Sequence, residues 1–187
     1  LYATCQKYDL RLFIDGARLG YGLVSAACDY DLPFLAKHCD VFYIGGTKVG
    51  AMMGEAVVFS GMKAPKYFFT NVKRHGALLA KGRMLGIQFD TLFTDELYFK
   101  ISRHAIAMAT RIRSIFEKHG IAIAYDSPTN QQFVVLSPTL YEALSQKVAF
   151  EIWERKSEHE IICRFVTSWA TKEEELDELD HILQAYA

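Results

Sequence analysis

Three features that would assign the sequence to a special class of protein are missing. Its four cysteines include no Cys-x-x-Cys pair, so we expect reduced thiols, with neither a disulfide framework nor a zinc site. No stretch approaches the roughly 18 consecutive apolar residues that a membrane helix needs. Residues 1–7 lack the basic-then-apolar order of a signal peptide. The sequence therefore predicts a cytoplasmic protein without a membrane partner.

An excess of charge of one sign is also missing. The 21 Lys and Arg residues are balanced by 22 Asp and Glu residues, which gives a formal net charge of −1. Because no large positive field is available to hold nucleic acid or an anionic membrane, we expect small molecules or proteins as partners, and no nucleic acid. His38 and Cys39 are adjacent, but no second ligand pair follows at zinc-finger spacing, so we expect no metal site.

The composition that is present belongs to a folded, globular chain. Hydrophobic residues make up 51% of the 187 residues and charged residues 23%, which excludes disorder as the main state. The length suggests one domain with a small second one. We find no internal repeat and no low-complexity tract. The sequence begins without a methionine, and we expect it to be a piece of a longer protein.

The first part of the chain has the pattern of a mixed α/β sheet. Residues 10–14 (LRLFI) and 41–44 (VFYI) are apolar runs typical of strands buried on both faces. A short helix over residues 32–38, with Pro33 in its first turn, fits between them as in a βαβ unit. The run at residues 56–59 (AVVF) follows the second run too closely for a parallel crossover, so we expect it to pair antiparallel.

The middle of the chain is predicted to be helical. Apolar residues recur at helical steps between residues 66 and 93, although three glycines interrupt the pattern. The clearest helix runs over residues 95–119. Thr94 is its expected N-cap, and Gly120 is expected to end it.

After Gly120 the chain alternates short elements of both kinds. We expect strands at residues 121–124, 132–136 and 161–167, and a helix at residues 139–147. A last helix is expected to follow a capping box of Thr171 and Glu174. The predicted fold is therefore α/β: residues 1–93 form the end of a large domain with a mixed, mostly parallel sheet. Residues 94–187 form a small α+β C-terminal domain.

Two side chains that follow the first two predicted strands are candidates for chemistry. Ligands in open α/β sheets gather outside the carboxyl ends of the strands, where this chain has Asp15 and, in a glycine-rich loop, Lys48. A carboxylate and a lysine so placed are typical of enzymes that use pyridoxal phosphate, whose aldehyde the lysine binds as a Schiff base. The carboxylate keeps the cofactor's ring nitrogen protonated, because at an effective dielectric of ~20 charges ~3–4 Å apart attract by roughly 4–5 kcal/mol.

The segments around both residues resemble the cofactor-binding segment of a known family. FIDGARLG (Phe13–Gly20), followed by IGGTKVGA (Ile44–Ala51), is similar to the pyridoxal-phosphate-binding segment of threonine aldolases and β-eliminating lyases, which have the fold of aspartate aminotransferase, fold type I. The resemblance implies that Asp15 pairs with the pyridine nitrogen, that Arg18 lies beside the cofactor's phenolic oxygen and the substrate, and that Lys48 holds the cofactor.

The same resemblance assigns two further residues and shows differences from the family. Arg164, in the segment ICRFVTSWAT, matches the arginine that receives the α-carboxylate of the amino acid. Thr47 stands where the family commonly has serine before the lysine, so we expect it to contact the phosphate. Family members carry an N-terminal half with a phosphate-cradling loop and a ring-stacking histidine, and no segment of this sequence matches it. The chain therefore resembles the C-terminal portion of the family.

Each of these residues also has an ordinary structural interpretation. Taken singly, Asp15 before a glycine is typical of a turn, and Lys48 of a solvated loop. Their combination with Arg18 and Arg164 favours a pyridoxal phosphate site. Arg164 lies in an apolar strand where its charge needs a partner, and an internal Asp or Glu would serve as well as a substrate carboxylate.

Three other patterns bear on a functional role. The segment GGTK at residues 45–48 is not a nucleotide phosphate loop, because that motif needs the lysine before the hydroxyl residue. The basic cluster at residues 73–75 either reaches a phosphate on a neighbouring subunit or forms a solvated charge run. His104 is expected to be a packed residue of the core or of an interface.

The function that the resemblance implies is that of a pyridoxal-phosphate-dependent lyase acting on a small amino acid. Aldol cleavage of a β-hydroxy amino acid such as threonine into glycine and an aldehyde is the leading hypothesis, in a homodimer or homotetramer. Asp15 and Lys48 are the expected catalytic residues. A β-eliminating lyase or another enzyme of this cofactor class is an alternative. So is a truncated, non-catalytic homologue that acts only as a folding or dimerisation module.

Overall fold

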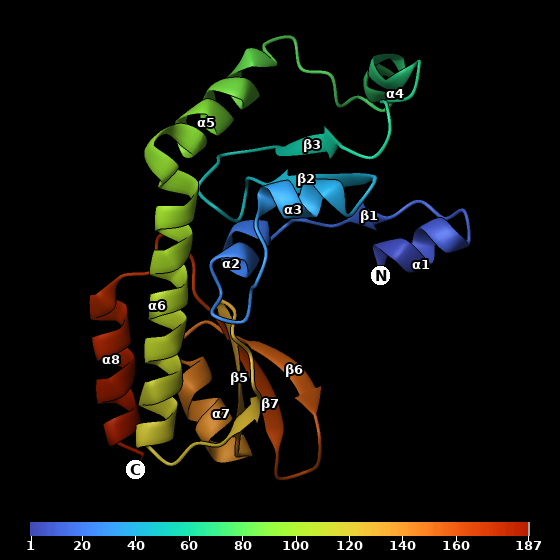
Figure 1. The fold of residues 1–187 in the computed structure, drawn as a ribbon. Coiled ribbons are helices and arrows are strands. Elements are labelled where there is room, and N and C mark those ends of the chain that lie inside the picture. The colour runs from blue at the N-terminus through green and yellow to red at the C-terminus, as the bar shows by residue number, and fades with distance from the viewer. Residues whose placement is uncertain (187) are drawn as a thin grey trace. The chain divides into compact units, whose positions relative to one another are not determined.

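The structure is a computed structural model that describes residues 1–186 (Figure 1). These residues form two compact units. The first comprises residues 1–23 and 28–100, and the second comprises residues 24–27 and the chain from residue 101 onward. The domain boundary expected after residue 93 remains a prediction.

The sheet of the first unit has three strands in the order β1-β2-β3. β1 (Phe13–Ile14) pairs parallel with β2 (Val41–Gly45), and β3 (Glu55–Phe59) pairs antiparallel with β2. This arrangement confirms the parallel pair and the antiparallel third strand that the apolar runs predict. β1 is shorter than its apolar run, because only two of those residues pair with β2.

The crossover between β1 and β2 carries the short helices α2 (Leu19–Leu23) and α3 (Leu32–Lys37). The side chain of Asp31 caps α3 by accepting a hydrogen bond from the Phe34 N–H at 2.8 Å. Such a cap satisfies a donor that the first helical turn leaves without a partner. The predicted short helix is therefore confirmed. Buried side chains of both helices, of β2 and of the connection between α3 and β2 form a small core: Leu19, Leu35, Phe42 and Cys39.

Further helices of the first unit are α1 (Tyr2–Lys7), α4 (Phe68–Arg74) and α5 (Arg83–Phe93), followed by a 3₁₀ turn (Thr94–Glu96) and the long helix α6 (Leu97–Lys118). The expected role of Thr94 as N-cap of α6 is wrong. Its hydroxyl donates to the Asp90 carbonyl at 2.8 Å, so Thr94 closes the end of α5 instead. Gly120 follows α6 with φ +71°, which confirms it as the residue that ends the helix.

The sheet of the second unit is antiparallel and has the order β4-β5-β7-β6. Its strands and its two further helices are β4 (Ile123–Tyr125), β5 (Gln131–Leu136), β6 (Glu151–Arg155), β7 (Ile161–Val166), α7 (Pro138–Ser145) and α8 (Glu173–Gln184). β6 is not among the predicted strands, because every residue of the segment EIWER is exposed and the run lacks an alternating apolar face.

The capping box of the last helix lies one residue later than predicted. The Lys172 N–H donates to the Glu175 side chain at 3.0 Å at the start of α8. Thr171 instead accepts a hydrogen bond from the Ser168 N–H at 2.9 Å. Thr171 therefore organises the loop before the helix, and Glu174 has no part in the box.

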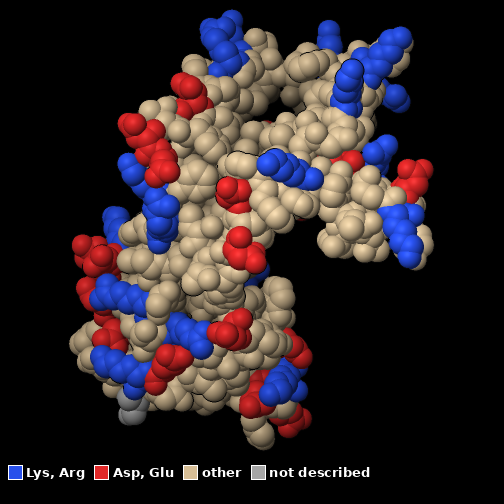
Figure 2. All heavy atoms as spheres, viewed as in Figure 1, with Lys and Arg blue, Asp and Glu red and all other residues tan. Residues whose placement is uncertain are grey.

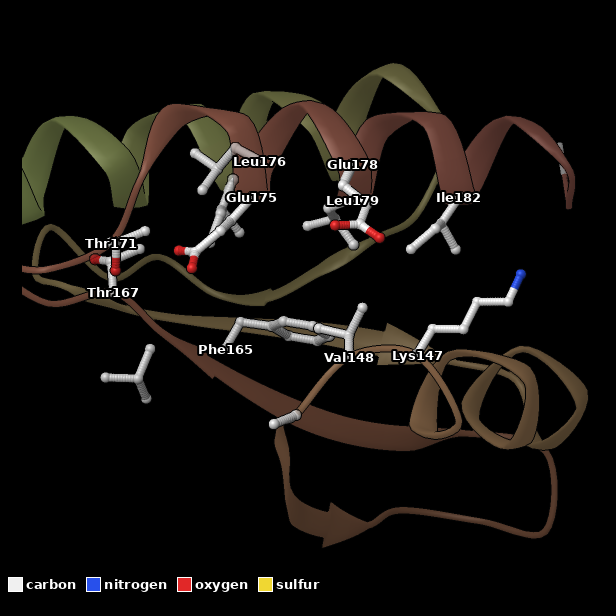
Figure 3. Close-up of a pocket in the computed structure, with 13 residues that line it drawn as sticks. Lys147, Val148, Phe165, Thr167, Thr171, Glu175, Leu176, Glu178, Leu179 and Ile182 are labelled. Carbon is white, nitrogen blue, oxygen red and sulfur yellow. The ribbon is translucent and has the colours of Figure 1, made fainter.

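The second unit has the larger core. α6 and α8 lie side by side against its sheet (Figure 1), and the buried apolar side chains of these elements meet there, including Phe116, Leu136, Phe165, Leu179 and Leu183. Ion pairs join Arg111 to Asp177 and Lys118 to Asp180 across the two helices. Basic and acidic side chains are accordingly intermixed on this part of the surface in Figure 2. Within residues 1–186, no helix is both long enough and apolar enough to cross a membrane.

Candidate active site

The carboxyl ends of β1 and β2 are held together by two glycines. The Gly45 N–H donates to the Gly16 carbonyl at 2.9 Å. A Cβ on Gly16 would lie 1.7 Å from the Tyr43 carbonyl oxygen, and a Cβ on Gly45 would lie 2.4 Å from the Ala17 carbonyl oxygen. Only glycine fits at either position, because a larger residue would collide with backbone. This close approach places Asp15 and the loop after β2 at the same edge of the sheet.

Asp15 is exposed at this edge, and its carboxylate is fixed by two hydrogen bonds. Its Oδ1 accepts from the Tyr43 hydroxyl and from the Ala17 N–H, the latter at 3.0 Å. The bond from Tyr43 lowers the pKa of Asp15 most, followed by the bond from Ala17, with the positive charges of Lys48 and Arg18 adding to the effect. The side chain is therefore a carboxylate at neutral pH.

Tyr43 is a member of this site that sequence reasoning missed. Its hydrogen bond to the Asp15 carboxylate raises the pKa of the Tyr43 phenol to about 12, so the phenol stays protonated and continues to donate. Ring contact with Phe13, at 6.1 Å between centroids, accompanies this bond. The position of Tyr43 follows from the fold: continuing the parallel register of β1 and β2 by one residue puts Asp15 opposite Tyr43.

Lys48 lies in the loop that connects β2 with β3. Glu55, the first residue of β3, accepts hydrogen bonds from the Gly46 N–H at 2.6 Å and from the Thr47 hydroxyl at 3.0 Å. On the other side of this position, the Tyr21 hydroxyl donates to the Lys48 carbonyl oxygen. The side chain of Lys48 is exposed, so a fixed backbone presents its ammonium group to solvent.

Tyr98 ties the beginning of α6 to both strand ends. Its side chain is fully buried, and its hydroxyl accepts from the Gly20 N–H and donates to the Gly45 carbonyl, both at 3.0 Å. Burial raises the pKa of Tyr98 well above its usual value, so the hydroxyl remains a donor. Sequence reasoning missed this residue as well, since nothing local relates it to glycines 53 and 78 positions away.

Of the five predicted site residues, Asp15, Arg18, Thr47 and Lys48 lie in the first unit. Arg18 stands between β1 and α2, is partly buried, and adds its positive charge to the surroundings of Asp15. The Thr47 hydroxyl is engaged by Glu55. The structure thus brings the two motifs of the sequence to one edge of the first sheet.

Arg164 lies in the second unit, in the middle of β7. Its guanidinium pairs with Glu151 on β6, donates to the Gln131 side chain at 3.0 Å, and lies 5.3 Å from the centre of the Trp153 ring. Its Nε is buried without a hydrogen-bond partner among residues 1–186. An internal carboxylate therefore partners this arginine, as one of the two sequence interpretations allows, and its role in substrate binding stays a prediction.

The remaining candidates have structural positions. His104 Nε2 lies 2.7 Å from the Thr171 carbonyl oxygen and so links α6 to the loop before α8, which confirms a packed residue. The basic residues 73–75 are exposed at the end of α4. In the part of the chain that the structure describes, no group of three or more His, Cys, Asp or Glu side chains is placed to hold a metal ion.

Comparison with known proteins identifies relatives of one kind. No family model matches the chain. Low specificity L-threonine aldolases of Pseudomonas sp. and Pseudomonas aeruginosa are 29% and 28% identical to it over 178 residues. That alignment covers 95% of this chain and 51% of each relative. The chain therefore spans about half the length of the curated relatives it matches.

Solved structures agree with these relatives. A threonine aldolase from Leishmania major superposes with a TM-score of 0.94 at 37% identity, covering 99% of this chain and 54% of that one. A serine palmitoyltransferase of Sphingomonas wittichii and a lysine aminotransferase of M. tuberculosis, at 11% and 14% identity, give TM-scores of 0.66 and 0.55 over 98% of this chain and 49% and 43% of theirs. The last two show a shared fold. Together, the matches confirm the resemblance to threonine aldolases and the predicted fold class.

Proposed function

We propose that this chain, which corresponds to the C-terminal half of threonine aldolases, is the part of a pyridoxal-phosphate-dependent lyase that binds the cofactor ring and the substrate carboxylate. The reaction would be cleavage of a β-hydroxy amino acid such as threonine into glycine and an aldehyde. The observation that carries this proposal is the Gly16–Gly45 junction, which puts the Asp15 carboxylate and the Lys48 loop at the same edge of the sheet.

The residues at this edge fit the cofactor. Both hydrogen bonds of the Asp15 carboxylate use Oδ1, and among residues 1–186 its Oδ2 accepts none. An exposed carboxylate with a lowered pKa and a free oxygen is the group required to face a cationic ring nitrogen. The Lys48 ammonium, exposed and without a hydrogen-bonded side-chain partner in the described chain, is the corresponding nucleophile.

When bound, pyridoxal phosphate supplies an electron sink for cleavage of a bond at the substrate's Cα. Lys48 would hold the cofactor through Nζ, and Asp15 would keep a proton on the ring nitrogen. We retain Asp15, Arg18 and Lys48 as the proposed cofactor-binding residues, while the hydroxyl of Thr47, the fourth predicted one, donates to Glu55. Arg18 and Arg164 are the proposed substrate-binding residues, and for Arg164 this requires the substrate carboxylate to replace or join Glu151 as its partner.

The wider setting of the protein is also part of the proposal. We place it in the cytoplasm, as a homodimer or homotetramer, with residues 1–93 in the large domain and residues 94–187 in the small one. The first unit supports an assembled state, because it exposes apolar side chains such as Met52 and Phe69, at 85% and 72%, that further protein would bury.

The first test of the proposal is chemical labelling of Lys48. Borohydride added to the chain with a low concentration of pyridoxal phosphate should fix a pyridoxyl group on Lys48 in preference to exposed lysines such as Lys63, as peptide mass spectrometry would show. Lys48→Ala should remove this label, and Lys63→Ala is the matched control that should retain it. Label spread evenly over the exposed lysines would contradict the cofactor site.

The second test concerns the reaction. The complete gene product that contains this sequence should release glycine and an aldehyde from L-threonine, and its Lys48→Ala variant should lose this activity. The alternative is a truncated, non-catalytic homologue that acts only as a folding or dimerisation module. That alternative predicts no preferential label on Lys48 and no cleavage of threonine by the complete gene product.

A further inference from the structure

The loop that carries Lys48 is the turn of an antiparallel hairpin. The last paired residues of β2 and β3 are Gly45 and Glu55, so residues 46–54 span the turn. Gly50 and Gly54 have φ angles of +92° and +86°, which favour glycine. Within the turn, the Gly46 carbonyl accepts from the Val49 and Ala51 N–H groups at 2.9 and 3.0 Å. The peptide around Gly46 is therefore the structural centre of the loop.

Glu55 binds this centre with both of its carboxylate oxygens. Oε2 accepts from the Gly46 N–H at 2.6 Å, and Oε1 accepts from the Thr47 hydroxyl at 3.0 Å. Hydrogen bonds to an ionised acceptor are roughly twice as strong as neutral ones. One side chain thus fixes the two residues that immediately precede Lys48.

Tyr21 completes the arrangement from the other side of the lysine. Its hydroxyl donates to the Lys48 carbonyl oxygen, and its side chain is almost fully buried in the first unit. The peptide group after the Lys48 Cα is therefore held directly, and the two residues before it are held through the Gly46 N–H and the Thr47 hydroxyl, while the Lys48 side chain is exposed. A nucleophile presented from a fixed backbone loses less freedom when it reacts.

The contact to Glu55 also decides what the Thr47 hydroxyl can do. A hydroxyl has one proton to donate, and in this loop it goes to the Glu55 carboxylate. A phosphate group offers mainly acceptor oxygens and carries negative charge, so it would compete for the same proton and be repelled by the neighbouring carboxylate. The hydroxyl is better suited to fixing the loop than to binding phosphate.

We infer that Glu55 is a positioning residue for Lys48, which acts by fixing Gly46 and Thr47, and that Thr47 serves this contact instead of holding the cofactor phosphate. The inference rests on the proposed function for the role of Lys48. It goes further by assigning a role to Glu55 and by revising the role expected for Thr47.

Gln88 on α5 provides a matched control within the same loop. Its Oε1 accepts from the Met52 N–H at 2.7 Å, and its Nε2 donates to the Met53 carbonyl at 3.4 Å. Gln88 thus holds the distal part of the loop through hydrogen bonds to its backbone, and within residues 1–186 none of its hydrogen bonds goes to a residue next to Lys48. Loss of Gln88 should loosen residues 52–53 and leave Lys48 in place.

The experiment compares hydrogen exchange of the loop with labelling of Lys48 in the chain without bound cofactor. Glu55→Ala should speed amide exchange at Gly46 and lower the borohydride-fixed label on Lys48 by about tenfold, the typical effect of losing one strong hydrogen bond or more. Glu55→Gln keeps an acceptor oxygen, so it should restore part of the protection of the Gly46 amide and part of the label on Lys48. Gln88→Ala should speed exchange at Met52 and leave the label on Lys48 within about twofold.

The aldehyde used for labelling separates the two roles of Thr47. Pyridoxal lacks the phosphate, so Thr47→Val should reduce labelling by pyridoxal and by pyridoxal phosphate to the same extent if the hydroxyl only fixes the loop. A loss confined to pyridoxal phosphate would overturn this part of the inference, because it would show a phosphate contact. Far-ultraviolet circular dichroism of each variant checks that the fold is retained.

The outcomes distinguish the inference from the proposed function. Absence of preferential label on Lys48 in the wild-type chain counts against the proposed function, while exchange at Gly46 still tests Glu55. Preferential label in the wild type that Glu55→Ala leaves unchanged, with unchanged exchange at Gly46, would overturn the positioning role and leave the proposed function standing.

Discussion

The pKa of Asp15 is lowered mainly by a tyrosine on the neighbouring strand. The bond from the Tyr43 hydroxyl lowers the pKa of Asp15 more than the backbone bond or the nearby cations do. The same bond raises the pKa of Tyr43 to about 12. The two shifts have one cause, since the hydrogen bond is strongest between a protonated phenol and an ionised carboxylate. The carboxylate therefore stays anionic to a lower pH, in an exposed place where a cationic ligand can reach it.

Tyr43→Phe should raise the pKa of Asp15 toward its ordinary value of 3.8. Because the folded-state pKa is lowered, the contribution of Asp15 to stability is present above 3.8 and is lost as the pH falls through the lower, folded value. The variant should therefore be less stable than the wild type at neutral pH, with the difference disappearing in acid. Carboxyl chemical shifts followed through a pH titration measure the pKa directly.

The control for this prediction is Tyr8→Phe. Tyr8 is 63% exposed and lies beside Lys7, so its loss removes a phenol without touching Asp15. The titration of Asp15 should then be unchanged. A Tyr43→Phe titration that matches the wild type would contradict the assignment of Tyr43 as the main cause of the shift.

The part of the site that was predictable from sequence is the part encoded in contiguous segments. Asp15 and Lys48 follow apolar runs and lie in recognisable motifs. Glu55 and Tyr98 were not found, because each acts through a backbone partner that only the fold brings near. Tyr98 shows this most clearly. In the sequence it is one more aromatic residue of a predicted helix, yet in the structure its hydroxyl forms hydrogen bonds with Gly20 and Gly45.

At the scale of elements, the junction of β1 and β2 depends on the absence of side chains. Gly16 lies so close to β2 that a Cβ would sit 1.7 Å from the Tyr43 carbonyl oxygen. The neighbouring atom is backbone and cannot move without displacing the strand. The two glycines are thus the structural reason why the tips of the strands, and with them the two motifs, come together.

Gly16→Ala should therefore destabilise the first unit by about 3 kcal/mol or more, the size expected when a buried position is overpacked against backbone. Gly22→Ala is the control, because Gly22 lies in α2 with no atom within 4 Å of an added Cβ. That substitution should leave stability unchanged or raise it by about 0.5–1 kcal/mol. Denaturant unfolding followed by circular dichroism compares the two, and equal midpoints would contradict the packing argument.

Elements with a clear period or a clear stop were predictable, and those shaped by tertiary contacts were not. α6 has a long apolar stripe and ends at Gly120, and β7 is a continuous apolar run. β6 was missed because its exposed residues show no alternation. The observed helix caps differ from the predicted ones for a similar reason. Thr94 and Thr171 each have a hydroxyl that could cap the next helix, but each hydroxyl forms a hydrogen bond with the preceding helix or loop.

At the scale of the molecule, the two units differ in the size of their cores. Among the described residues, eight buried hydrophobic side chains belong to the first unit. Sixteen belong to the second, and thirteen of these form one cluster between its helices and its sheet. Because burial of apolar surface is the main favourable term in folding, the first unit should be the less stable of the two. The candidate cofactor residues belong to that less stable unit.

We therefore expect the two units to unfold at different denaturant concentrations, with the first unit opening first. Trp153 and Trp169 are the two tryptophans of the sequence and both lie in the second unit, so their fluorescence reports that unit alone, while amide exchange along β2 reports the first. Phe42→Ala should lower the denaturant concentration at which amide exchange shows the first unit to unfold. It should leave the midpoint of the fluorescence transition unchanged. Phe116→Ala should lower the fluorescence transition, by about 3–5 kcal/mol for a large buried side chain. If the two transitions coincide and both substitutions shift them equally, the chain unfolds as one cooperative body. The size of its own core would then not determine the stability of the first unit.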